Sequence, residues 1–174
     1  LKKLNRAKVE GLLIHNISDI EDNQFNTLFC KLCQFKEKGI VEKIGFSTYT
    51  PSQVDFLLSN FDFDLIQVPL NVFDTRLVNG GQLQALKNKS VEIHIRSVFL
   101  QGLLLDFDAL GGYFSSWKNE FDDYQEMVED SGLTLLEYAL NYVLNIEEID
   151  KVFVGVNNKK QLIEIVEASQ NKFD

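Results

Sequence analysis

Basic residues, cysteine and proline are scarce in this 174-residue sequence. Lysine and arginine number 17 against 26 acidic residues, and the net charge of −9 disfavours binding to nucleic acid or to an anionic membrane. No apolar run reaches the roughly 18 residues of a membrane span. A charged start followed by an apolar core and a cleavage site is also missing, so no secretory signal is expected. We therefore expect a cytoplasmic location and neither a nucleic-acid nor a membrane partner.

Two cysteines, Cys30 and Cys33, form a single C-x-x-C spacing. One interpretation is a redox pair or half of a metal site. The other places both on a helix with an apolar face at helical spacing. Because no second pair exists and neither histidine is near in sequence, we favour the helix. No metal site is predicted, and a reducing compartment is expected.

Five apolar segments alternate with helix-like segments along the chain. Strands are predicted over 8–15, 43–48, 64–69, 91–97 and 151–155, and helices over 23–38, 50–60, 80–89, 113–130, 134–145 and 158–169. Capping boxes mark two helix starts, at Thr50 with Gln53 and at Thr134 with Glu137. This alternation predicts repeated βα units with a parallel sheet. The length and the 45% apolar composition suit one domain, which we place at 1–174.

Polar residues stand where four of these strands end. They are His15, Ser47, Gln67 and Arg96, one for each of the first four strands. In a barrel of parallel strands, ligands bind at the carboxyl ends. Alternation along the strands turns these side chains to the inside of the barrel. On the fourth strand the same alternation turns Glu92 and His94 inward and Ile93 and Ile95 toward the helices.

Five motifs resemble the aldo-keto reductases in order and spacing. They read GLLIHN, GIVEKIGFSTYTPSQV, DLIQVPLNVFD, IRSVFLQGLLL and VFVGVNNKKQL. The resemblance covers nearly the whole chain, but it is to the carboxyl-terminal part of the family's barrel, strands four to eight. It implies a partial TIM (β/α)8 barrel of about five parallel strands with intervening helices. It also implies that the chain is a piece of a longer polypeptide.

The resemblance further implies an oxidoreductase that reduces a small aldehyde or ketone by hydride transfer from NAD(P)H. His15 resembles the histidine of the family's catalytic tetrad, which orients the substrate carbonyl and stabilises developing charge. The tetrad's tyrosine, aspartate and lysine have no matching position in this chain. Tyr49 and Lys43 have suitable chemistry but stand elsewhere. The 174 residues alone are therefore expected to be inactive.

The resemblance also carries over cofactor contacts. Ser47 and Gln67 match residues that hold the nicotinamide carboxamide, and Thr48 stands where asparagine is usual. Arg96 occupies the place of an aromatic ring that stacks on the nicotinamide, and a planar guanidinium can stack as well. The segment after it resembles the loop around the pyrophosphate, although a valine replaces the usual proline. Its expected contacts are Ser97, Val98, Phe99, Gln101 and Gly102.

The last motif resembles the site for the adenosine phosphate, where a helix N-terminus favours an anion. Its expected contacts are Gly155, Asn157, Asn158 and Gln161. Asn158 stands where arginine is frequent, and Ile165 where asparagine often contacts adenine. Lys159 and Lys160 either supply the positive charge instead or form a solvated helix turn. The resemblance implies NADP(H) in preference to NAD(H).

Two other interpretations remain open. The first is a non-catalytic member of the family that acts as a cofactor-sensing or interaction module, because fold alone does not decide activity. The second is a free half barrel that self-associates with another copy through its open sheet edges.

Overall fold

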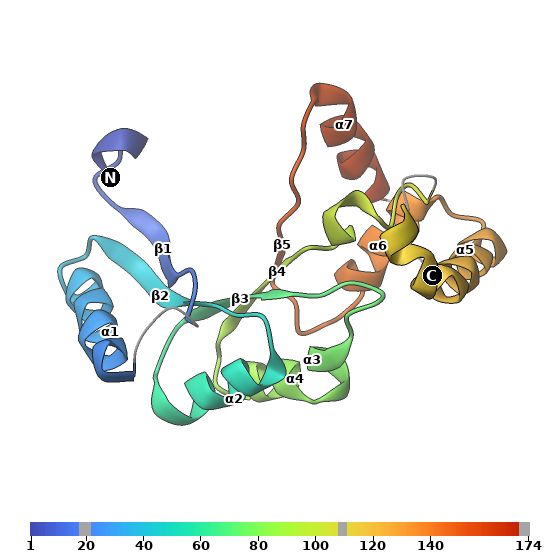
Figure 1. Cartoon of the computed structure of the whole chain (residues 1–174). Coiled ribbons are helices and arrows are strands. Elements are labelled where there is room, and N and C mark those ends of the chain that lie inside the picture. The colour runs from blue at the N-terminus through green and yellow to red at the C-terminus, as the bar shows by residue number, and fades with distance from the viewer. Residues whose placement is uncertain (18–21, 108–110, 171–174) are drawn as a thin grey trace. The chain divides into compact units, whose positions relative to one another are not determined.

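The computed structural model describes residues 1–17, 22–107 and 111–170. Five parallel strands lie in sequence order across one sheet, with helices between them (Figure 1). This arrangement confirms the predicted α/β class. The strands are β1 (Val9–Ile14), β2 (Val41–Ser47), β3 (Leu65–Pro69), β4 (Glu92–Arg96) and β5 (Lys151–Val152).

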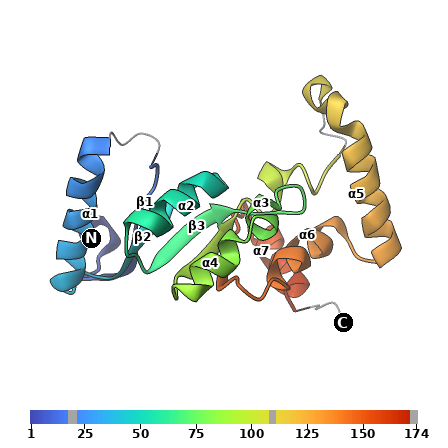
Figure 2. The same ribbon diagram turned by 90° about the horizontal axis from the view of Figure 1, so that it is seen from below.

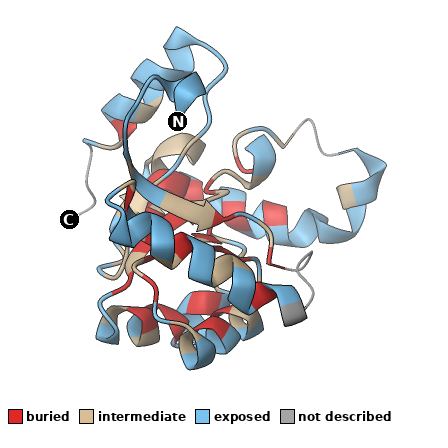
Figure 3. Cartoon of the chain, turned by 90° about the vertical axis from the view of Figure 1, so that its left-hand side faces the viewer, coloured by how far each residue is buried: buried red, intermediate tan, exposed pale blue. Residues whose placement is uncertain are grey.

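The chain divides into two compact units. The first comprises Leu1–Val68 and Arg76–His94, and the second comprises Pro69–Thr75 and Ile95–Asp174. The single domain expected from the sequence stays a prediction. Figure 3 shows that buried residues lie on strands and helices in the interior, whereas the outward sides of the helices are exposed. No helix in the described part of the chain is long and apolar enough to cross a membrane.

Phenylalanine rings form the core beside β2 in the first unit. Phe46 is fully buried, and its ring centroid lies 5.7 Å from those of Phe25 and Phe29 on α1 (Asp22–Glu37). Phe61 and Phe63 lie against the same ring, at 5.7 and 5.2 Å. Because Phe46 points to the helices, its neighbours Gly45 and Ser47 point to the other face of the sheet, as the alternation predicted.

The second helix of the first unit, α2 (Pro51–Asn60), has the predicted start. The Thr50 hydroxyl accepts from the Gln53 amide, and the Gln53 side chain accepts from the Thr50 amide in return. The helix predicted over 80–89 forms as α4 (Gln82–Asn88), and a short helix that was not predicted, α3 (Arg76–Asn79), precedes it. Gly81 lies between them with a φ of 77°, a left-handed conformation that favours glycine and breaks a helix. Figure 2 shows α4 beside α2.

Helices make up most of the second unit, with short 3₁₀ segments between them. It contains η2 (Leu100–Gly102), η3 (Gly112–Trp117), α5 (Lys118–Ser131), α6 (Leu135–Leu144) and α7 (Lys159–Ala168). Its core includes Leu104, Phe121, Tyr124, Val128 and Ala139. Burial raises the pKa of the Tyr124 hydroxyl above its ordinary value. The predicted capping box of Thr134 and Glu137 starts α6.

The helix predicted over 113–130 begins later than expected. Residues 112–117 form a 3₁₀ turn, and the α-helix starts at Lys118. Because a 3₁₀ turn has 3.0 residues instead of 3.6, Phe114 and Trp117 leave the apolar face that the later residues share. Trp117 is 56% exposed, whereas Phe121 and Val128 are buried.

Candidate functional site

The ends of β2 and β3 bring together two of the predicted contacts. Ser47 pairs with Gln67 in the parallel register, and the amide of Thr48 donates to the carbonyl of Gln67 at 3.0 Å. Ser47 and Thr48 are fully buried. The Ser47 Oγ has no hydrogen-bond partner among the described residues. Because a buried hydroxyl costs free energy until it is hydrogen-bonded, this atom can receive a polar group of a ligand.

His15 follows β1 at the same edge of the sheet. The last register pair of β1 and β2 joins Ile14 to Phe46, and His15 and Ser47 come one residue later on each strand. The side chain of His15 is exposed, in contrast to the buried Ser47. In the first unit, the strand ends therefore present an accessible imidazole on β1, buried hydroxyl groups on β2 and the half-buried amide of Gln67 on β3.

A pocket of about 1100 Å³ lies within the second unit. Its lining comes from the end of β4 and the loop that follows it, from the start of α6, from residues 153–157 and from α7. Of the cofactor contacts predicted in this unit, only Asn158 is missing from the lining. The others that line it are Arg96, Ser97, Val98, Phe99, Gln101, Gly102, Gly155, Asn157 and Gln161.

The loop after β4 has an unusual backbone. Ser97, Leu100 and Gln101 have φ values of 62°, 46° and 60° in the left-handed region, and Gly102 follows at 93°. Because such backbone conformations cost free energy, they are maintained only where the surrounding structure imposes them.

Asn71 is a positioning residue that the sequence did not single out. Its side-chain amide donates to the carbonyl of Ser97 at 3.1 Å. Its Oδ1 accepts from the amides of Phe73 and Asp74 at 2.9 and 3.0 Å. Asn71 is 1% exposed, so these bonds are shielded from water and hold the start of the loop. An asparagine two residues after the third strand was the available signal, because asparagine often bonds to the backbone two residues later.

The charges around the pocket are mixed. Arg96 is the one lysine or arginine in its lining, and its Nη1 donates to the Ser97 hydroxyl at 3.3 Å. Three carboxylates also line it, those of Glu137, Glu164 and Glu167. Lys159 and Lys160 lie outside the lining, exposed in the first turn of α7.

The start of α7 is held by its own side chains. Asn158 caps the helix by accepting from the amide of Gln161 at 3.0 Å. The Gln161 side chain accepts from the amide of Asn157 at 2.8 Å. An anion at this helix end would have to use the remaining amides of the first turn or the lysines.

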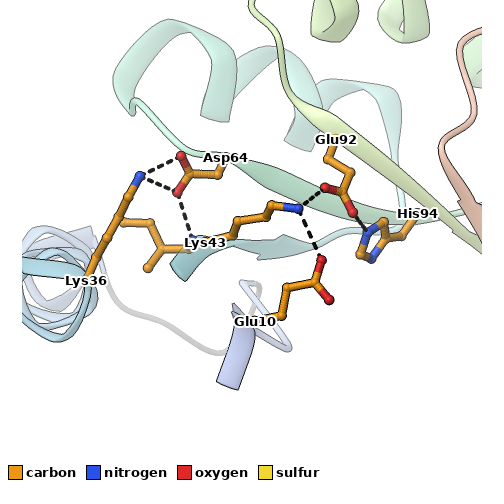
Figure 4. A network of polar contacts seen from close by, with 7 residues as sticks. Glu10, Lys36, Lys43, Asp64, Glu92 and His94 are labelled. Atoms are coloured by element: carbon orange, nitrogen blue, oxygen red, sulfur yellow. Dashed lines mark hydrogen bonds and ion pairs between the residues drawn. The ribbon is translucent and has the colours of Figure 1, made fainter. Parts of the chain in front are cut away.

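A charged network crosses three strands of the first unit (Figure 4). Lys43 on β2 forms ion pairs with Glu10 on β1, at 3.1 Å, and with Glu92 on β4. Glu92 also contacts the Nε2 of His94 at 2.6 Å. The hydrogen bond from Glu92 raises the pKa of the Lys43 ammonium. Glu92 and His94 thus share a face, as the alternation predicted, and Lys43 offsets part of the negative charge of the two glutamates.

The two cysteines are free thiols on α1. Cys30 is exposed and Cys33 is half-buried. Burial is the main cause that raises the pKa of the Cys33 thiol, with a smaller contribution from Cys30. A raised pKa leaves less of the reactive thiolate, so this arrangement agrees with the helical interpretation of the C-x-x-C spacing.

Comparison with known proteins places this geometry in a family. The model of the Aldo/keto reductase family matches residues 1–174. A search of curated protein sequences found no match. Among solved structures, the holo form of an aldo-keto reductase from Bacillus halodurans is similar, with a TM-score of 0.77 and 18% identity over 98% of this chain and 58% of that one. Its apo form has a TM-score of 0.79.

The glycerol dehydrogenase from Gluconobacter oxydans is also similar in structure. Its TM-score is 0.65, with 16% identity over 99% of this chain and 63% of that one. At such identities the likeness concerns the fold. The chain spans less than two thirds of the length of these structures, and its five-stranded fold matches part of their barrels.

Proposed function

The chain belongs to the aldo/keto reductase family, and on that premise we propose that it supplies the cofactor site of an NAD(P)H-dependent oxidoreductase. The substrate is a small aldehyde or ketone. The five strands correspond to strands four to eight of the family barrel. The observation that carries the proposal is the pocket of the second unit, which is lined by nearly all the cofactor contacts predicted there.

The pocket suits a dinucleotide in size and chemistry. Its volume of about 1100 Å³ is at the upper end of ordinary small-molecule sites. The amides of Val98 and Phe99 can donate to phosphate oxygens, and Arg96 supplies a planar cation. The Asn71 side chain holds the loop that carries these amides, so little backbone ordering is needed on binding.

The strand ends of the first unit hold the reactive part of the cofactor in this proposal. The unpartnered Ser47 hydroxyl, with Thr48 and Gln67, contacts the nicotinamide carboxamide. When bound, the nicotinamide supplies the hydride. The exposed His15 orients the substrate carbonyl and donates to its oxygen as negative charge develops there. The tyrosine, aspartate and lysine of the family tetrad have no match in this chain, so turnover needs groups that these 174 residues do not supply.

Lys159 and Lys160 decide the cofactor preference in this proposal. Among the described residues that line the pocket, Arg96 is the one lysine or arginine, and it is assigned to the nicotinamide end. The positive charge for the additional 2′-phosphate of NADP(H) therefore comes from the two lysines. The variant Lys159→Ala/Lys160→Ala should weaken NADPH binding roughly tenfold, the scale of one to two surface charge contacts, and leave NADH binding unchanged. Equal affinity of the unaltered chain for NADPH and NADH would contradict this preference.

Titration of the chain with NADPH, followed by the cofactor's own emission, tests the proposal. We expect saturable binding that Arg96→Ala weakens at least about tenfold, because it removes the cation of the pocket. Arg76→Ala is the matched control, since Arg76 is an exposed arginine of the first unit that bonds to the Tyr49 carbonyl. A folded chain that does not bind NADPH at millimolar concentration would refute the proposal, and so would equal effects of the two variants.

The alternative function is a non-catalytic cofactor-sensing or interaction module. Fold alone does not decide between this function and the enzyme. Such a module would bind NADPH in the same pocket without reducing a carbonyl. A polypeptide that contains this chain with the other tetrad residues and turns over an aldehyde would exclude it.

A further inference from the structure

Two exposed surfaces of opposite charge lie outside the proposed cofactor site. The first, which we call the acidic face, comprises the outward residues of η3 and α5. Six carboxylates belong to it: Glu120, Asp122, Asp123, Glu126, Glu129 and Asp130. Lys118 pairs with Asp122. Glu120, Asp123, Glu126 and Asp130 have no ion-pair partner among the described residues.

Large apolar side chains are exposed on the same face. Tyr113 is 84% exposed, and Trp117 and Met127 are each 56% exposed. The opposite side of α5 is already occupied, because Phe121, Tyr124 and Val128 pack into the core of the second unit. Exposed aromatic and methionine side chains among polar residues are typical of protein–protein contacts.

The second surface, which we call the basic segment, comprises residues 1–8. It contains Lys2, Lys3, Arg6 and Lys8 and no acidic residue. Lys8 pairs with Glu42 at 2.6 Å, whereas no ion-pair partner is found in the described part of the chain for the other three cations. Leu1 and Leu4 are 45% and 64% exposed beside them. The segment thus has the opposite charge to the acidic face and a similar mixture of charged and apolar groups.

We propose that the basic segment of one copy of this chain docks on the acidic face of a second copy. The observation that favours a second copy as the partner is charge complementarity. The basic segment has three cations within six residues and the acidic face has four carboxylates within eleven, all without an ion-pair partner among the described residues. Each exposed ion pair contributes only about 0–1 kcal/mol. Several together steer association and set its orientation, and the leucines with Tyr113, Trp117 and Met127 supply apolar contact. The proposal is independent of the cofactor site.

Trp117 makes the docking measurable, because it is the single tryptophan of the chain. Docking covers its ring, so its emission should shift to shorter wavelength as the protein concentration rises at low salt. Sedimentation velocity on the same samples should show a larger species. In about 0.5 M NaCl the exposed charges are screened within a few ångströms, so we expect association through this contact to weaken at least tenfold.

Complementary charge reversals identify the contact. One variant, Lys2→Glu/Lys3→Glu/Arg6→Glu, reverses the basic segment, and another, Asp123→Lys/Glu126→Lys/Asp130→Lys, reverses the acidic face. Each variant by itself should associate at least tenfold more weakly than the unaltered chain. An equimolar mixture of the two variants should associate again. The first variant keeps its acidic face and the second keeps its basic segment, so the original contact can form between them. Lys31→Glu/Lys38→Glu, two exposed lysines on and after α1, is the control and should associate normally.

Circular dichroism on each variant separates lost docking from lost folding. Recovery in the mixture supports the proposal, since misfolded variants would not complement each other. If both variants associate as the unaltered chain does, the contact uses other surfaces, such as the open sheet edges, and the proposal is wrong. A mixture that stays monomeric, or a Trp117 emission that does not depend on concentration, would overturn it as well.

Discussion

Ser47 and Gln67 are register partners at the carboxyl ends of β2 and β3, and the Ser47 hydroxyl is buried without a hydrogen-bond partner among the described residues. A buried polar group of this kind costs free energy in the folded chain and is satisfied when a ligand bonds to it. The neighbouring strand ends thus bring together Ser47 and Gln67, the two residues proposed to bind the nicotinamide carboxamide.

Ser47→Ala should therefore change stability by less than about 1 kcal/mol, because no hydrogen bond to a described residue is lost. The same change should weaken NADPH binding about five- to tenfold, and Gln67→Ala should also weaken it with the fold intact. Urea denaturation and NADPH titration measure the two effects. Ser59→Ala on α2 is the matched control. A large loss of stability without any loss of NADPH affinity would point to a purely structural serine.

His15→Ala should act on turnover and not on cofactor affinity. In a polypeptide with the complete tetrad, removal of a donor to the developing oxyanion should lower kcat about 10²–10³-fold. Steady-state kinetics and NADPH titration provide the comparison. His94→Ala is an informative contrast, because His94 is buried against Glu92 and should affect stability instead. Unchanged turnover in the His15 variant would mean that the residue has another role.

Gly45→Ala should destabilise the first unit strongly. A Cβ at this position would lie 1.7 Å from the carbonyl oxygen of Leu65, so β2 and β3 would have to separate. We expect a loss of at least about 3 kcal/mol in the free energy of unfolding, measured with urea. Gly11→Ala is the control, because its Cβ would meet the Leu65 side chain at an ordinary 3.5 Å. Similar stabilities of the two variants would contradict the close approach.

Cys30 should react with iodoacetamide before Cys33 at pH 8. Burial raises the pKa of the Cys33 thiol, so less thiolate is present. The raised pKa also makes the free energy of unfolding depend on pH. The neutral Cys33 thiol favours the folded chain below the ordinary thiol pKa of about 8.5, and this contribution is lost as the pH rises through the raised pKa. Mass spectrometry of each site over time measures the rates. Equal rates would favour a reactive pair over two helical cysteines.

Local signals in the sequence were sufficient for most of the elements. The capping boxes at Thr50 and Thr134 rest on residues three positions apart, so they can be recognised without any tertiary contact. The alternating pattern likewise identified the five strands and the polar residues at their ends. The short α3 and the 3₁₀ segment before α5 were not predicted, because both depend on how the neighbouring segments pack.

The sequence by itself thus determined the order of strands and helices and which polar residues stand at strand ends. Only the tertiary structure decided which of them meet. Glu92 lies 49 residues from Lys43 along the chain, and Asn71 lies 26 residues from Ser97, yet each pair is in contact. Burial of the Ser47 hydroxyl and the volume of the pocket are likewise set by packing between distant segments. Periodicity and capping are local properties, whereas these contacts arise only when the strands align in register.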